Sequence, residues 1–270
     1  MKNYLIIKHL QIQNANASSG AYIMGFPAMT AWLGAVHALQ RKINHKPEYK
    51  DVQFIQVGVV AHKCTPHSRR INYYNNLIIP KKPLKEAAAK QPSFTPDPLI
   101  NLNVSLIIET NKIDGDLFEH FEKTITNEVM RIKVASGTVL KIPRVSLETA
   151  STQQEEKRIL QSLLPGYAII ERKDILLENP QAKDNLNLML TRLASWEKGC
   201  RLAPIVTGFK QISDFVKVKN QRDYSLPHFF AESVVTLGEY RMPYRFENID
   251  EMMWHYSINK EQGLYLCVNQ

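Results

Sequence analysis

Residues 4–13 read YLIIKHLQIQ, an apolar stretch with scattered polar residues that predicts the first β-strand of the fold. Residues 14–24 are small and polar, which is typical of a loop. The Gly-Phe-Pro sequence at 25–27 then predicts a helix start, because proline suits the first helical turn. Further along, the pattern predicts a helix over 25–43, strands over 51–63 and 98–110, a helix over 114–133 with Asp114 as its N-cap, and a short strand over 138–142.

This β-α-β-β-α-β order predicts an α+β fold with a ferredoxin-like (RRM-like) body, in which two helices cover one face of an antiparallel sheet. Residues 149–225 interrupt the pattern with helices expected over 152–163 and 184–196, and Thr152 and Glu155 have capping-box spacing. A strand over 229–240, a short helix over 248–256 and a strand over 264–268 follow. We therefore predict a body over 1–148, an inserted, partly helical head over 149–225, and a C-terminal part over 226–270 that completes the body.

The composition of the 270 residues, 44% hydrophobic and 22% charged, is typical of a chain with a substantial core. No apolar run approaches the roughly 20 residues of a membrane span, and residues 1–8 do not resemble a signal peptide. Cys64, Cys200 and Cys267 are few and widely spaced, which indicates a reducing compartment. We therefore expect a cytoplasmic protein with no membrane partner.

Charge is distributed unevenly along the chain, whose formal net charge is +8. The window 41–90 contains eleven Lys or Arg and three acids, a net of +8, whereas 101–130 contains two lysines and six acids, a net of −4. A basic window beside an acidic one favours a localised site for a polyanion such as nucleic acid. A solvated basic loop is the alternative interpretation.

Familiar catalytic signatures are missing: the sequence has no GxxxxGK[ST], GxGxxG, HExxH or GxSxG motif. The best metal-binding pattern is His62-x-Cys64-x-x-His67, and no second ligand pair follows at zinc-finger spacing. We therefore expect no metal and no cofactor.

Two segments have the composition of nucleic-acid contacts. Residues 13–20 concentrate amides, hydroxyls and small residues before a helix, where backbone N–H groups favour anions; alternatively, these side chains cap their own backbone. Residues 62–76 combine cations with aromatic rings, the chemistry of phosphate pairing and base stacking; alternatively, the tyrosines cover the core. The residues of this second cluster are Lys63, Arg69, Arg70, Tyr73 and Tyr74.

An ordered set of short segments spans nearly the whole chain: QNANA at 13–17, GFP at 25–27, VHALQRK at 36–42, VGVVAHK at 57–63, LLPGYAIIER at 163–172, ESVVTLGEYR at 232–241 and WHY at 254–256. In this order the segments resemble the Csy-family backbone subunit, Cas-five-like, of the type I-F CRISPR surveillance complex. The resemblance implies a ferredoxin-like body with an extra head. It also implies a non-catalytic subunit, since a separate endoribonuclease matures the guide.

The resemblance further implies the partners. One copy would hold the repeat-derived 5′ handle of the CRISPR RNA together with the large subunit, beside a backbone filament subunit. Target DNA would be recognised by guide pairing in the assembled complex. On this basis we expect handle contacts from Asn14, Asn16, Ser18 and Ser19, a phosphate contact from Arg41, and further RNA contacts from the cluster at 63–74 and from Arg241. Phe26, Trp32 and Trp254 are expected in the core.

Two alternatives differ in class from this reading. A metal-independent endoribonuclease that processes repeat RNA would use His37, His62 or His67 as general acid or base. A subunit that acts mainly as a protein linker would leave the RNA to its partner.

Overall fold

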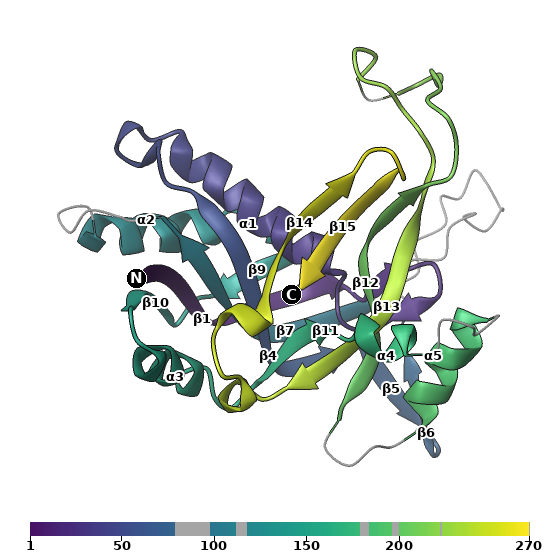
Figure 1. Ribbon diagram of the computed structural model, residues 1–270, viewed down its shortest axis with the longest axis horizontal. Helices are drawn as coiled ribbons and strands as arrows, with labels where there is room; N and C mark the ends of the chain where they lie inside the picture. Colours follow the sequence, from purple (N-terminus) through teal and green to yellow (C-terminus); the bar gives the residue numbers. More distant parts are fainter. Residues whose placement is uncertain (79–97, 112–117, 179–183, 196–199, 222, 270) are drawn as a thin grey trace, which may run out of the picture.

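The computed structural model describes residues 1–78, 98–111, 118–178, 184–195, 200–221 and 223–269 (Figure 1). One large antiparallel sheet with a few helices forms the framework of the molecule, so the fold is a mixed one of α and β elements. Among the described helices, none is long and apolar enough to cross a membrane. The expected N-cap Asp114 lies outside the described residues.

The strands of the large sheet are β1 (Lys2–Asn16), β4 (Phe54–Pro66), β7 (Leu99–Thr110), β8 (Lys133–Val134), β9 (Gly137–Lys141), β10 (Arg144–Ala150), β11 (Tyr167–Glu171), β12 (Leu202–Gln211), β13 (Ala231–Arg241), β14 (Met253–Asn259) and β15 (Leu264–Asn269). Two small hairpins are separate from it: β2 (Ser18–Gly20) with β3 (Ile23–Met24), and β5 (Ser68–Ile71) with β6 (Tyr74–Leu77). The helices are α1 (Met29–Asn44), α2 (Phe118–Val129), α3 (Gln153–Gln161), α4 (Lys173–Leu177) and α5 (Asn185–Ala194), and short 3-10 turns occupy Pro47–Tyr49, Pro243–Arg245 and Asp250–Met252.

The order of strands across the sheet is β11-β13-β12-β15-β14-β4-β7-β1-β9-β8, and β10 also pairs with β1. One edge of β4 pairs with β7, and its other edge is shared by two strands. Gly58 and Val57 pair with β14, whereas Val60 and Ala61 pair with β11. Strands β11 and β12, from the segment predicted as a head, thus belong to the same sheet as β4. The three-part division of the chain stays a prediction.

Two hydrophobic clusters cover the central strands. Helices α1 and α2 lie together on one face of the sheet (Figure 1), where Trp32 and Phe121 are fully buried against strand residues such as Leu10 and Val104. On the other face, α3 packs on Ile6 and its neighbours. The expected core residues Trp32 and Trp254 are buried, and Phe26 stacks on Trp32 with ring centroids 5.2 Å apart, so this prediction is confirmed.

Most predicted elements have counterparts, and several boundaries needed correction. The capping box at Thr152 and Glu155 is confirmed at the start of α3. The loop expected over 14–24 is wrong in part, because β1 continues to Asn16 and the β2–β3 hairpin follows. The helix expected over 248–256 is also wrong in part, since a single 3-10 turn there leads into β14, which pairs with β4 and β15.

Candidate nucleic-acid interface

The hairpin β5–β6 carries four of the predicted contact residues. Arg69 and Arg70 lie on β5, Tyr73 lies in the turn, and Tyr74 begins β6 opposite Ile71. The side chain of Tyr73 is 91% exposed and that of Tyr74 is 75% exposed, so the alternative that these tyrosines cover the core is wrong. The hairpin therefore presents two cations and two aromatic rings to solvent, the combination that single-stranded nucleic acid needs.

The hairpin is attached to one end of the central sheet. The backbone N–H of His67 donates to the carbonyl oxygen of Leu99 at 2.9 Å, at the start of β7. At the same end, Asn16 of β1 pairs with Leu99, and Pro66 of β4 pairs with Ile100. This arrangement brings the predicted residues of β1 and the exposed Lys63 of β4 to the end of the sheet from which the hairpin extends (Figure 1).

The polar segment before α1 uses part of its hydrogen-bonding capacity internally. Oδ1 of Asn16 accepts from the backbone N–H of Ser18 at 2.7 Å, and the hydroxyls of Ser18 and Ser19 donate to carbonyl oxygens of the β2–β3 hairpin. The N–H of Gly25 donates to the carbonyl of Ala17, so the segment folds back toward the start of α1. These bonds agree with the alternative that the side chains cap their own backbone.

Arg41 lies apart from the hairpin. Arg41 is exposed near the C-terminal end of α1, where the neighbouring Gln40 accepts from the N–H of Phe54 at the start of β4. Because Phe54 and the hairpin are at opposite ends of β4, the structure does not bring Arg41 together with the other predicted residues. A role for Arg41 in phosphate binding stays a prediction.

Arg241 is engaged in an ion-pair cluster. Its guanidinium donates to both carboxylate oxygens of Glu239, at 3.0 and 2.8 Å, and Arg172 also donates to this carboxylate. Burial raises the pKa of Glu239, whose residue is only 2% exposed, but the bonds from Arg241 and Arg172 outweigh burial and the pKa lies below its ordinary value. A phosphate at Arg241 would therefore compete with a buried carboxylate.

The histidines of the endoribonuclease alternative do not converge. His37 is exposed on α1, and His67 lies beyond the end of β4. His62 uses both ring nitrogens: Nδ1 donates to the carbonyl oxygen of Pro165 at 2.5 Å, and Nε2 accepts from the hydroxyl of Ser105 at 2.7 Å. Burial lowers the pKa of His62, the Pro165 carbonyl opposes this effect, and the adjacent His9 ring lowers the pKa further. His62 is thus a neutral, structurally engaged side chain.

The zinc pattern at 62–67 does not form a ligand cluster. Over the described ranges, no group of three His, Cys, Asp or Glu side chains could hold a metal ion. Cys64 pairs with the core residue Leu102, whereas His62 faces Ser105 on the opposite side of the sheet. The irregularity in β4 between Ala61 and Lys63, where the register with β7 shifts, therefore places the first two residues of the pattern on opposite faces of the sheet.

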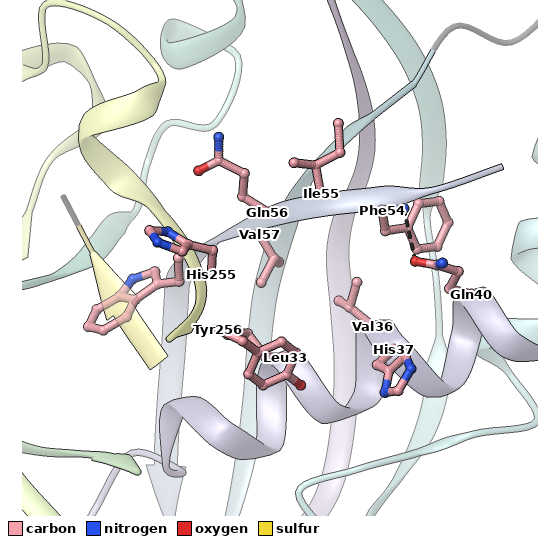
Figure 2. Close-up of a pocket in the computed structure, with 11 residues that line it drawn as sticks. Leu33, Val36, His37, Gln40, Phe54, Ile55, Gln56, Val57, His255 and Tyr256 are labelled. Carbon is pink, nitrogen blue, oxygen red and sulfur yellow. Dashed lines mark hydrogen bonds between the residues drawn. The ribbon is translucent and has the colours of Figure 1, made fainter. Parts of the chain in front are cut away.

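A pocket of about 200 Å³ lies between α1, β4 and β14 (Figure 2). Apolar side chains such as Leu33 and Val57 form most of its wall, and His37 and His255 lie on different elements. Its two amides are engaged: Gln40 accepts from the N–H of Phe54, as drawn in Figure 2, and Gln56 donates to Glu109 at 2.8 Å. This set of groups contains no nucleophile paired with a base.

Sequence reasoning missed two β-bulges in β1. At His9 and at Asn14 the backbone φ is positive, 54° and 55°, and the register with β7 shifts. Each freed N–H donates to a side chain of β7: that of His9 to Oγ of Ser105, and that of Asn14 to Oδ1 of Asn101, both at 3.0 Å. The polar alternation of 101–105, NLNVS, was the available signal, since it marks a strand face without a hydrophobic cover.

Two comparisons relate the sequence of this chain to known proteins. The sequence profile of the family described as CRISPR-associated protein (Cas_Csy2) matches residues 5–198 and 193–267. CRISPR-associated protein Csy2 of Pseudomonas aeruginosa (strain UCBPP-PA14) is 26% identical over 312 aligned residues, which cover 97% of this chain and 93% of that protein. Because the profile extends over nearly the whole chain, this protein belongs to the Csy2 family of CRISPR-associated proteins.

Proposed function

We propose that this protein is a non-catalytic subunit of a cytoplasmic type I-F CRISPR surveillance complex. In this proposal it holds the 5′ handle of the CRISPR RNA together with the large subunit, next to the backbone filament subunit, and it meets target DNA through the assembled complex. Family membership supports the complex, and the exposed hairpin β5–β6 is the observation that supports RNA binding. We interpret the central order β4-β7-β1-β9, with α1 and α2 on one face, as a ferredoxin-like, Cas-five-like body.

Hairpin β5–β6 would bind through two separable interactions. Arg69 and Arg70 would pair with phosphates, and this contribution weakens with salt because counterions are released on binding. Tyr73 and Tyr74 would stack on unpaired bases, each stack contributing about 1–3 kcal/mol with little dependence on salt. Exposed positions suit this function, since binding then requires no unfolding of the core.

A structural role for the histidines supports the absence of catalysis. A general acid or base needs a ring nitrogen that can reach the substrate, and both nitrogens of His62 are bonded within the protein. His37 and His67 lie on separate elements, and neither is joined to a lysine or carboxylate in the described part of the chain. This arrangement favours a binding subunit over the endoribonuclease alternative.

Charge reversal on the hairpin tests the proposed function. The variant Arg69→Glu/Arg70→Glu is compared with Lys157→Glu/Lys260→Glu, which makes the same charge change at exposed positions on α3 and in the β14–β15 turn. Affinity for handle RNA is measured as a function of salt. We expect only the hairpin variant to bind more weakly, with a salt slope smaller by about 1.4, since each phosphate contact to a single strand contributes about 0.7. Equal affinity and slope in the two variants would refute the proposal.

A further inference from the structure

One row of polar residues crosses four strands of the sheet. Lys63 of β4 is the Cα partner of Asn103 in β7, Asn103 is the partner of Gln11 in β1, and Gln11 is the partner of Lys141 in β9. Directly paired residues lie on the same face of a sheet. Three strand spacings make this row about 14 Å long.

The row lies on the face opposite α1 and α2. The residues that flank Gln11 and Asn103 along their strands, such as Leu10 and Val104, belong to the core beneath those helices. Side chains alternate between the two faces of a strand, so the row points the other way. Lys63, Gln11 and Lys141 are exposed, and Asn103 is half-buried.

A second pair of cations continues this surface. Lys8 of β1 and Arg144 of β10 are direct Cα partners, so two like charges stand opposite each other. Such a pair destabilises neighbouring strands. Burial lowers the pKa of Lys8, Arg144 lowers it further, and Glu148 opposes this in part. We call Lys8, Gln11, Lys63, Asn103, Lys141 and Arg144 together the polar sheet face.

Three of the four cations of the polar sheet face make no ion pair within the described structure, and the fourth, Lys8, interacts electrostatically with Glu148. No ion pair or hydrogen bond from the side chains of Lys63, Lys141 or Arg144 occurs among the described residues. Its six residues include no acid and no apolar or aromatic side chain. The centre of a protein–protein interface is depleted of lysine and enriched in aromatic residues, so this composition fits a polyanion better than a protein.

We propose that the polar sheet face binds the sugar–phosphate backbone of single-stranded RNA. Lysine and arginine at both ends of the row pair with phosphates, and the amide of Gln11 in its centre meets base edges. Oδ1 of the neighbouring Asn103 is bonded to Nδ1 of His9 at 3.3 Å, so only its amide N–H groups face the RNA. The strand then continues past Lys63 to hairpin β5–β6, which supplies the stacking rings that the face lacks. This inference rests on the proposed function and extends it to a second surface of the same subunit.

The variant Lys141→Glu/Arg144→Glu tests the polar sheet face in the complex assembled with its guide RNA. Both residues are exposed, and the variant removes the repulsion between Arg144 and Lys8, so we expect a thermal midpoint by circular dichroism no lower than that of the wild type; Lys141→Gln/Arg144→Gln replaces the variant if folding fails. We expect handle-RNA affinity about tenfold or more weaker than for the control Lys157→Glu/Lys260→Glu, and a salt slope smaller by about 1.4. Gln11→Ala is expected to change base preference at one handle position without changing the slope.

The outcomes separate this inference from the proposed function. Loss of affinity in the hairpin variant but not in the Lys141→Glu/Arg144→Glu variant overturns the polar sheet face alone. Full affinity in both variants overturns the proposed function as well. If the Lys141→Glu/Arg144→Glu variant keeps its RNA but no longer co-elutes with the large subunit, the surface binds protein and the inference is wrong.

Discussion

The backbone N–H of Asn14 donates to the Oδ1 atom of Asn101, 3.0 Å away, across a bulge that ends the regular part of β1. The same arrangement occurs five residues earlier, where the N–H of His9 donates to Oγ of Ser105. Both bulged residues adopt positive φ, which suits Asn and His better than β-branched residues. The bulges set the register that aligns Gln11 with Asn103 and Lys141, so they build the polar sheet face.

The two bulges are expected to differ in how much their partners stabilise the fold. Ser105 is 1% exposed and bonds both His9 and His62, so Ser105→Ala leaves buried groups without partners and costs about 1–3 kcal/mol. Asn14 is exposed, water replaces the lost bond in Asn101→Ala, and the cost stays below about 1 kcal/mol. Urea unfolding measures both values, and equal costs would contradict this assignment.

His62 is expected to make stability depend on pH below neutrality. Its pKa is lowered in the folded state, chiefly by burial, so the unfolded chain binds more protons as pH falls below the ordinary value of 6.5. Its contribution to stability is therefore fully present above that pH and is lost as pH falls through 6.5 toward the folded pKa. His62→Gln should remove this part of the pH profile of unfolding free energy, whereas the exposed His37→Gln should preserve it. Profiles of equal steepness in the wild type and His62→Gln would show that burial does not hold the ring neutral in the folded state.

Stacking and phosphate pairing at hairpin β5–β6 are expected to separate by salt dependence. Tyr73→Ala/Tyr74→Ala should weaken handle-RNA binding by about 1–3 kcal/mol for each base that stacks, with the salt slope unchanged. Tyr73→Phe/Tyr74→Phe keeps the rings and should restore affinity. The exposed Tyr244→Ala is the matched control, and the same loss of affinity in that control would mean that the effect is not local to the hairpin.

Glu239 is expected to contribute to stability rather than to RNA binding. Glu239→Gln leaves Arg172 and Arg241 without the carboxylate they share, and we expect a loss of about 2 kcal/mol in unfolding free energy. The pKa of Glu239 is lowered in the folded state, so this contribution is present above its ordinary value of 4.5 and is lost as pH falls below it. Chemical unfolding at pH 7 and pH 4 tests this, and a difference between wild type and variant that is equal at both pH values would contradict it.

Repeat RNA is expected to remain intact with this protein in EDTA. The candidate acid–base groups are separated, and His62 is bonded through both nitrogens. Incubation of labelled repeat RNA with the purified chain, followed by gel analysis, gives the answer. Cleavage that disappears in His37→Gln or His67→Gln would support the endoribonuclease alternative instead.

The local pattern of apolar and polar residues was sufficient to predict much of the fold. The apolar periodicity of residues 25–43 predicted α1, and the run at 51–63 predicted β4, each within a few residues. The failures have a common cause, which is pairing between distant segments. Asn14 and Asn16 have turn composition, yet β7 pairs with both halves of β1 and keeps them in a strand. Residues 253–256 form β14 because β4 and β15 provide partners on both sides.

The sequence predicted only the part of the candidate site whose residues are close together in the chain. The cations and tyrosines of 63–74 are adjacent in sequence, so one hairpin presents most of them together. The row from Lys63 to Lys141 joins residues 78 positions apart, and two bulges in β1 shift the register that aligns them. No periodicity within one strand reports such a shift, since register depends on pairing between strands.

Photo-crosslinking of the assembled complex tests the central claim most directly. The guide RNA carries 4-thiouridine at single positions of its 5′ handle, and mass spectrometry identifies the attached peptides. We predict adducts in the segment 66–78, at Tyr73 or Tyr74, for at least one handle position. If every handle position crosslinks to other subunits and none crosslinks to this chain, the claim that this protein holds the start of the guide is contradicted.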